Sequence, residues 1–182
     1  MGEPADAIPV FSTVAKTAMD AGTVLALLSA DMISWDTCKD DFRWDGSFRD
    51  LYIRPASLDD WRTIYPFLQS QSEIEFSTES GPGVLPEDID ASFFENSRPT
   101  LRFRVGGILV VFHFFTPDEI ECDIDPREVT CQSGLDSLLA FLRQLGDLTR
   151  KRAVMTPENL PDEPIISYDP QTGAFQYHAS AA

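Results

Sequence analysis

The sequence predicts an α+β fold: an antiparallel sheet with a central three-strand meander, two main helices packed on one face, and a helical N-terminal extension. Three observations predict this class. Residues 98–125 alternate between apolar and polar positions around two turns, and residues 57–68 and 133–148 each carry an apolar stripe at helical spacing. One apolar sheet face and two striped helices imply two packed layers.

Three regions are expected along the chain. Residues 1–35 form the N-terminal extension, because residues 10–32 are good helix formers with apolar side chains at loose helical intervals, although Gly22 leaves open whether one helix or two form. Residues 36–178 form a single α+β domain, and residues 179–182 form a tail. With 182 residues, 43% of them hydrophobic, the chain can bury a core of this size.

The first half of the domain begins with a strand over residues 48–54. A helix then starts at Ser57, where a serine followed three residues later by Asp60 has the spacing of a capping box. Pro66 lacks a backbone donor, so a kink or an early end is expected near Tyr65. Beyond it the sequence predicts a strand over 73–78, a loop at 81–83 and a short helix from Pro86 through Phe94.

The meander occupies residues 98–125. Gly106 and Gly107 suit a two-residue hairpin turn, which requires positive φ angles. That turn sets the register of the first two strands. The expected pairs are Val105 with Ile108, Phe103 with Val110, and Leu101 with Phe112.

After the meander, a leucine stripe predicts a long helix that begins near Ser133, where Asp136 has capping-box spacing, and that ends near the cations of residues 150–152. Short strands are expected over 153–155, 165–168 and 174–177, separated by turns rich in proline.

The charge and the cysteines limit the function. A net charge of −16 with a pI near 4.3 argues against binding nucleic acid or an anionic membrane, and favours a basic protein partner. Three cysteines without CxxC spacing indicate reduced thiols in a cytoplasmic protein, with no metal or other cofactor. No apolar run is long enough to span a bilayer, and the first residues lack the basic start of a secretory signal.

Two acidic groups are candidate partner-binding surfaces. In the acidic row, alternation places four carboxylates about 7 Å apart along one strand face. The row serves as a docking surface for a cationic partner or a metal, or it is a solvated face offset by Arg102 and Arg104. Its members are Glu119, Glu121, Asp123 and Asp125.

The second group, the aromatic–acidic segment, interleaves acids with large rings. Such rings are typical of interface hot spots, but they equally serve to anchor the segment onto the sheet, which we favour. Its members are Trp35, Asp36, Asp40, Asp41, Phe42, Trp44 and Asp45. No sequence frame typical of a nucleophilic, zinc or phosphate site is present.

Three stretches carry a family resemblance: WDGSFRDLYIRPASLDDW (44–61), VGGILVVFHFF with EIECDIDPREV (105–129), and TPENLPDEPIISYDP (156–170). Together they resemble small acidic proteins of Gram-negative bacteria similar to the immunity proteins of polymorphic toxins. The resemblance spans residues 36–178 and assigns no binding residue. It implies a cytoplasmic protein that occupies a toxin's active site or blocks its folding.

The leading hypothesis is therefore a non-catalytic acidic binding protein that neutralises a basic toxin or effector through the two acidic groups. One alternative is an enzyme with a cleft near His113, a residue that shares its strand face with Arg102 and Asp123. Another is an oligomer-forming subunit, which would expose an apolar patch at Leu109, Val111 and Phe115.

Overall fold

The computed structural model describes residues 33–95 and 98–179. The predicted N-terminal extension, apart from its last three residues, lies outside this range, as does the predicted tail beyond Ala179. Within the described residues no helix has the length and apolar character needed to cross a membrane.

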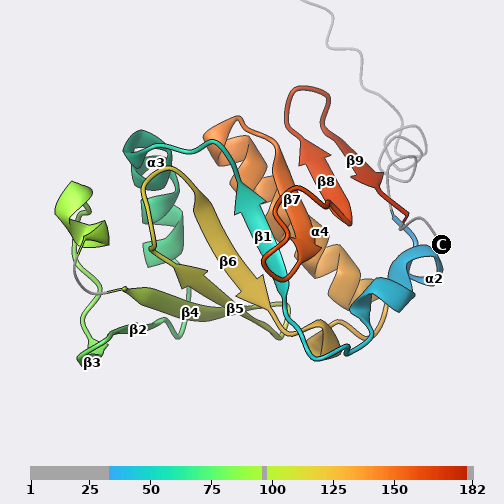
Figure 1. Cartoon of the computed structure of the whole chain (residues 1–182), viewed down its shortest axis with the longest axis horizontal. Helices are drawn as coiled ribbons and strands as arrows, with labels where there is room; N and C mark the ends of the chain where they lie inside the picture. Colours follow the sequence, from blue (N-terminus) through green and yellow to red (C-terminus); the bar gives the residue numbers. More distant parts are fainter. Residues whose placement is uncertain (1–32, 96–97, 180–182) are drawn as a thin grey trace, which may run out of the picture. The chain divides into compact units, whose positions relative to one another are not determined.

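The described residues form one antiparallel sheet of nine strands with helices, which confirms the α+β class (Figure 1). The strand order is β3-β2-β4-β5-β6-β1-β7-β8-β9. The strands are β1 (Arg49–Ile53), β2 (Glu75–Thr78), β3 (Gly81–Gly83), β4 (Thr100–Val105), β5 (Ile108–His113), β6 (Ile120–Ile124), β7 (Ala153–Pro157), β8 (Ile166–Asp169) and β9 (Ala174–Tyr177). The helices are α2 (Trp35–Cys38), η1 (Lys39–Phe42), α3 (Leu58–Gln69), η2 (Ala91–Phe94), η3 (Pro126–Glu128) and α4 (Gln132–Thr149).

The hairpin between β4 and β5 has the register that the Gly106-Gly107 turn predicts. Val105 pairs with Ile108, Phe103 with Val110, and Leu101 with Phe112. Both glycines adopt positive φ angles, 56° and 92°, as a primed turn requires. β6 then pairs with β5 on one side and with β1 on the other. One face of these strands is therefore continuously apolar.

Helices α3 and α4 both contact this apolar face, which we call the inner face. The rings of Trp61 on α3 and Phe141 on α4 each pack against Phe112 on β5, with centroids 6.4 and 6.2 Å away. Trp61 is fully buried, and its indole N–H donates to the carbonyl of Glu119 at 3.1 Å. The sheet face away from these helices is the outer face.

Helix α3 starts as the sequence predicts, because the Ser57 hydroxyl accepts a hydrogen bond from the backbone N–H of Asp60. The expected early end near Tyr65 is wrong. The helix continues through Pro66 to Gln69, since Tyr65 and Leu68 are both buried in the core and the packing outweighs one missing backbone bond.

Three further expectations need correction. The capping box at Ser133 does not form: α4 starts earlier, at Gln132, whose side chain donates to Asp136 at 2.7 Å. The segment Gly81–Gly83, expected as a loop, pairs with β2 as an edge strand. The helix expected from Pro86 is shorter and is the 3-10 turn η2, because Asp90 accepts from the backbone N–H of Ser92 and caps it there.

Candidate functional site

The acidic row lies along β6 and just beyond its two ends. Ile120, Cys122 and Ile124 point into the core, so Glu121 and Asp123 point to the outer face, where they are half-buried. The sheet register puts Glu121 between His113 and Tyr52, and puts Asp123 between Val111 and Asp50. The carboxylates of the acidic row therefore follow one another along the strand in the same order as in the sequence.

Two members of the row have a guanidinium in contact, and a third contacts an imidazole. Glu119 forms an ion pair with Arg54 at 3.2 Å, and Asp123 contacts Nε2 of His113 at 2.6 Å. Asp125 pairs with Arg127, whose guanidinium donates to both carboxylate oxygens. These bonds lower the pKa of Asp125. Two of the row's four carboxylates are therefore matched by an arginine.

The expected cations are not the ones that match the row. Arg104 instead pairs with Glu128, at 3.3 Å, since the side chain of Glu128 also accepts from the backbone N–H of Leu109 and is held beside β5. Arg102 forms no salt bridge within the described part of the chain. Neither arginine forms an ion pair with a member of the row, and the expectation that they offset its charge across the sheet stays a prediction.

Glu121 is the member of the row without a cation in contact. Burial raises its pKa to about 7, and the neighbouring carboxylates of Asp50 and Glu119 add to the effect. Asp50 is 3% exposed because the connection after β7 covers it, with the backbone N–H of Asn159 donating to it at 2.7 Å. Tyr52 donates to the same oxygen at 3.0 Å. Burial likewise raises the pKa of Asp50.

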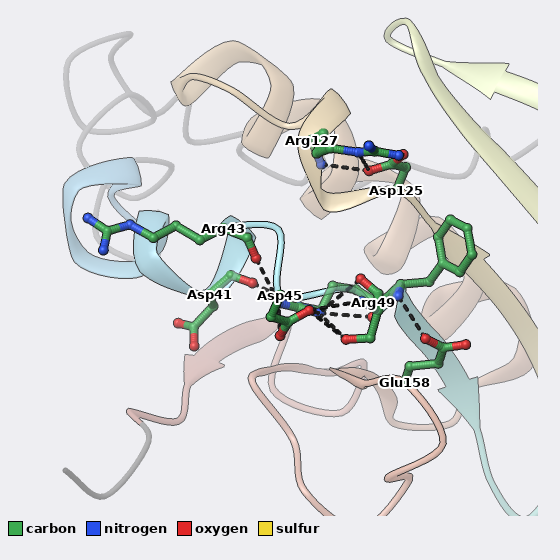
Figure 2. Close-up of polar contacts among 9 residues, drawn as sticks. Asp41, Arg43, Asp45, Arg49, Asp125, Arg127 and Glu158 are labelled. Carbon is green, nitrogen blue, oxygen red and sulfur yellow. Dashed lines mark hydrogen bonds and ion pairs between the residues drawn. The ribbon is translucent and has the colours of Figure 1, made fainter.

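The aromatic–acidic segment is held by a residue that sequence reasoning missed, Arg49. Its guanidinium is 4% exposed and donates to the backbone carbonyls of Asp41, Arg43 and Phe48 as well as to Asp45. Figure 2 shows these contacts converging on Arg49. The loop lacks regular backbone hydrogen bonds, and the buried guanidinium of Arg49 supplies donors to its carbonyl oxygens instead.

The acids of this segment are also matched. Asp36 pairs with Lys39, Asp40 with Arg43, and Asp45 with Arg49, at 3.0 to 3.1 Å. Hydrogen bonds from Ser47 and Arg49 lower the pKa of Asp45. Asp41 accepts a hydrogen bond from the hydroxyl of Tyr177 at 2.7 Å.

The two tryptophans of the segment differ. Trp35 packs on the buried Phe42, with ring centroids 5.5 Å apart, so this part of the segment anchors it to the core. Trp44 is 44% exposed and lies under the guanidinium of Arg127, 4.0 Å from its centroid. Arg127 also binds Asp125, as Figure 2 shows. Through its contacts with Trp44 and Asp125 it joins the aromatic–acidic segment to one end of the acidic row.

The outer face also carries a groove of about 330 Å³, which we call the outer groove. Leu109 and Val111 of β5 are its apolar lining, and the exposed ring of Phe48 lies against Trp44, 6.1 Å away. His113 lines the groove and stacks on the exposed ring of Phe115, with centroids 5.0 Å apart. The remaining lining residues are Arg102, Asp123, Asp125 and Glu128.

The outer groove holds one imidazole, that of His113, beside the carboxylate of Asp123. Residues 33–95 and 98–179 contain no group of three or more His, Cys, Asp or Glu side chains that could hold a metal ion. The carboxylate of Asp123 accepts a hydrogen bond that orients the imidazole of His113, but the two residues contact no serine hydroxyl or cysteine thiol among the described contacts. The groove offers acceptor oxygens beside apolar rings.

Sequence reasoning located Glu121 and Asp123 but missed Arg49, Asp50 and Tyr52. The signal was present in β1, RDLYI, where polar side chains interrupt a strand that is buried at every position. A sequence does not show which loop will cover a strand, so the burial of Asp50 was not predictable.

Comparison with known proteins adds no relative: no family model, no curated protein and no solved structure matches the chain. The similarity to immunity proteins therefore stays a prediction.

Proposed function

We propose that the chain is a non-catalytic acidic binding protein that neutralises a basic protein partner, specifically an immunity protein that inhibits a bacterial toxin or effector in the cytoplasm. The observation that carries this proposal is the outer groove, where Asp123 and Asp125 line the same hollow as the exposed ring of Phe48. The exposed rings of Trp44 and Phe115 pack on two lining residues, Phe48 and His113. Large exposed rings with flanking charges are what hot spots of protein interfaces contain.

The net charge of the protein supports a basic partner more strongly than any individual carboxylate does. Since most acids of both groups already have a cation within 4 Å, the individual carboxylates contribute little unpaired attraction. The net charge of −16 is unaffected by local pairing and raises the association rate with a cationic surface. It also disfavours nucleic acid as a ligand.

The contact energy is expected to come from the rings. Arg127 already holds Trp44 in place by stacking on it and binding Asp125, so the exposed ring loses little conformational freedom on association. An incoming lysine or arginine can lay its aliphatic stem on Val111 and reach Asp123 or Glu121 with its charged end.

The test is capture of partners by the tagged protein from the native organism, followed by measurement of association kinetics at several salt concentrations. We expect one basic protein, and an association rate that falls about tenfold or more between low and physiological salt. Capture of a partner whose binding is independent of salt would contradict the proposal.

Variants locate the interface. Trp44→Ala should mainly increase the dissociation rate, and the double variant Glu121→Gln, Asp123→Asn should lower the association rate about threefold to tenfold at low salt. Glu87→Gln is the matched control, because Glu87 is exposed on a loop that contacts α3 on the inner side of the sheet. Equal effects of control and groove variants would place the interface elsewhere.

A second candidate function is catalysis at His113, favoured by its hydrogen bond to Asp123 in the wall of the outer groove. One measurement distinguishes catalysis from partner binding. His113→Gln should abolish turnover of a substrate if the protein is an enzyme, whereas it should change partner binding only modestly if the groove is a docking surface. Light scattering tests the oligomer-forming alternative on the same samples.

A further inference from the structure

A cluster of cations lies on a different part of this acidic molecule, around the end of α4. Arg150, Lys151 and Arg152 follow the helix directly, and together with Arg54 they line one cleft of about 370 Å³. These are four of the fourteen lysines and arginines in the chain. Asp169 is the acidic residue among the lining residues of the cleft. The local charge is thus opposite in sign to that of the protein.

The fold builds this cleft through Gly146. A Cβ at this position would lie 2.7 Å from Cδ1 of Tyr168, so the missing side chain lets β8 pack against the last turns of α4. Arg150 then turns the chain with a left-handed φ of 55°, and the N–H of Lys151 donates back to the carbonyl of Gly146. This arrangement brings Asp169 beside the three consecutive cations.

Two of the four cations are already neutralised. Lys151 pairs with Asp60 at 2.7 Å, and the Nε of Arg54 pairs with Glu119 at 3.2 Å. Arg152 donates to the hydroxyl of Ser167 at 3.0 Å, and the side chain of Arg150 has no salt bridge or hydrogen bond among the described contacts. Arg150 and Arg152 therefore keep their full charge.

The helix end alone does not account for these charges. The dipole of a helix is equivalent to about half an elementary charge at its C-terminal end, and the effect is confined to the last turn. Three consecutive cations exceed what that end requires. Arg150 and Arg152 are thus available to a ligand.

A second cleft, of about 300 Å³, lies on the other side of Arg152 and adds polar groups. Ser167 lines it although its residue is only 3% exposed, and its hydroxyl contacts both Arg152 and Nε2 of His178, at 3.0 and 2.9 Å. Burial, together with the charge of Arg152, lowers the pKa of His178. The guanidinium of Arg152 is thus positioned by buried neutral groups and is not neutralised by them.

We propose that Arg150 and Arg152 bind the phosphoryl group of a small molecule in the cleft at the C-terminal end of α4. A guanidinium presents paired N–H donors that match two oxygens of a phosphoryl group, and two guanidiniums can hold such a group from two sides. A long polyanion is disfavoured, because the net charge of −16 would repel the charges that lie outside the cleft. This site is separate from the outer groove and does not depend on the proposed docking function.

The experiment is a titration of the full chain with inorganic phosphate and with pyrophosphate, with potassium chloride added to keep the ionic strength constant. Amide chemical shifts of residues 150–152 and 167–172 are followed by NMR. We expect saturable shifts confined to these residues, and tighter binding of pyrophosphate than of phosphate. Arg150→Gln and Arg152→Gln should each weaken binding about fivefold to tenfold.

Arg43→Gln is the matched control, because Arg43 is exposed and pairs with Asp40 in the aromatic–acidic segment. It should leave the titration unchanged. Arg150→Gln keeps the test decisive even if Arg152→Gln fails to fold, since no hydrogen bond of Arg150 is lost. The proposal would be overturned by shifts that never saturate, by shifts that chloride reproduces, or by an unchanged dissociation constant in Arg150→Gln.

Discussion

The raised pKa of Glu121 predicts that the protein loses stability as the pH rises towards neutral. The carboxyl titrates near 4.5 in the unfolded chain and near 7 in the folded protein, because burial and the charges of Asp50 and Glu119 disfavour its ionised form. Between these values the folded state binds more protons than the unfolded state. The free energy of unfolding contributed by Glu121 therefore falls as the pH rises from about 4.5 to about 7, and stays low above it.

The size of the effect follows from the shift. A rise from 4.5 to about 7 corresponds to roughly 3 kcal/mol at about 1.4 kcal/mol per pH unit, and the partial solvent access of Glu121 reduces the expected value to about 1–2 kcal/mol. Glu121→Gln keeps the shape of the side chain and removes its charge. This variant should be more stable than the wild type by about 1–2 kcal/mol at pH 8 and nearly equal to it at pH 4.5.

Urea denaturation at pH 4.5, 6, 7 and 8, followed by tryptophan fluorescence, measures this difference. Subtracting the two proteins at each pH cancels the titration of shared groups that do not interact with Glu121, such as His178. Glu87→Gln, at an exposed position, should follow the wild type throughout. A difference between Glu121→Gln and the wild type that does not grow with pH would refute the assigned cause.

Three further predictions concern the groups that hold the fold together. Arg49→Met should reduce the free energy of unfolding by about 2–4 kcal/mol and increase hydrogen exchange over residues 39–48, because several carbonyls lose their buried donor. The control Arg43→Met, at an exposed side chain, should change the free energy of unfolding by less than about 0.5 kcal/mol. Trp61→Ala should lower the free energy of unfolding, measured by chemical denaturation, by about 3–5 kcal/mol, because the ring is fully buried. A smaller loss would mean that the core collapses around the cavity. Gly106→Ala should lower the free energy of unfolding by about 1–3 kcal/mol, because the new Cβ would clash with the side chain of Ser137. Adding Ser137→Gly should restore part of this loss. If it restores nothing, the cost comes from the positive φ of the backbone alone.

Local patterns were sufficient to predict much of the sheet. The alternation of residues 101–105 and the two glycines that follow predict both the strand and its register, because the side-chain period and the turn length leave one pairing that keeps the apolar residues on a single face. The Ser57 cap was predictable for the same reason, since its bonds join residues three apart. The course of α3 through Pro66 was not, because core contacts from distant segments outweigh the local cost.

The acidic members of the candidate site were predictable from the sequence, but the groups that pair with them were not. The outward direction of Glu121 and Asp123 follows from strand period alone. Their partners do not, because His113, Arg54 and Arg127 reach the acidic row only after the strands pair and η3 forms. The sequence gives the net charge, whereas the distances between charged groups depend on the folded structure.

By itself the sequence determined the α+β class, the main strand and helix positions, the hairpin register and the large negative charge, because each depends on residues close together in the chain or on composition alone. The tertiary structure decided which carboxylates are buried, which are paired, and where cations gather. Burial of Asp50 under the segment after β7, and the meeting of Arg54 with Arg150 and Arg152, join residues about 100 positions apart. Contacts of that range leave no periodic signal in a sequence.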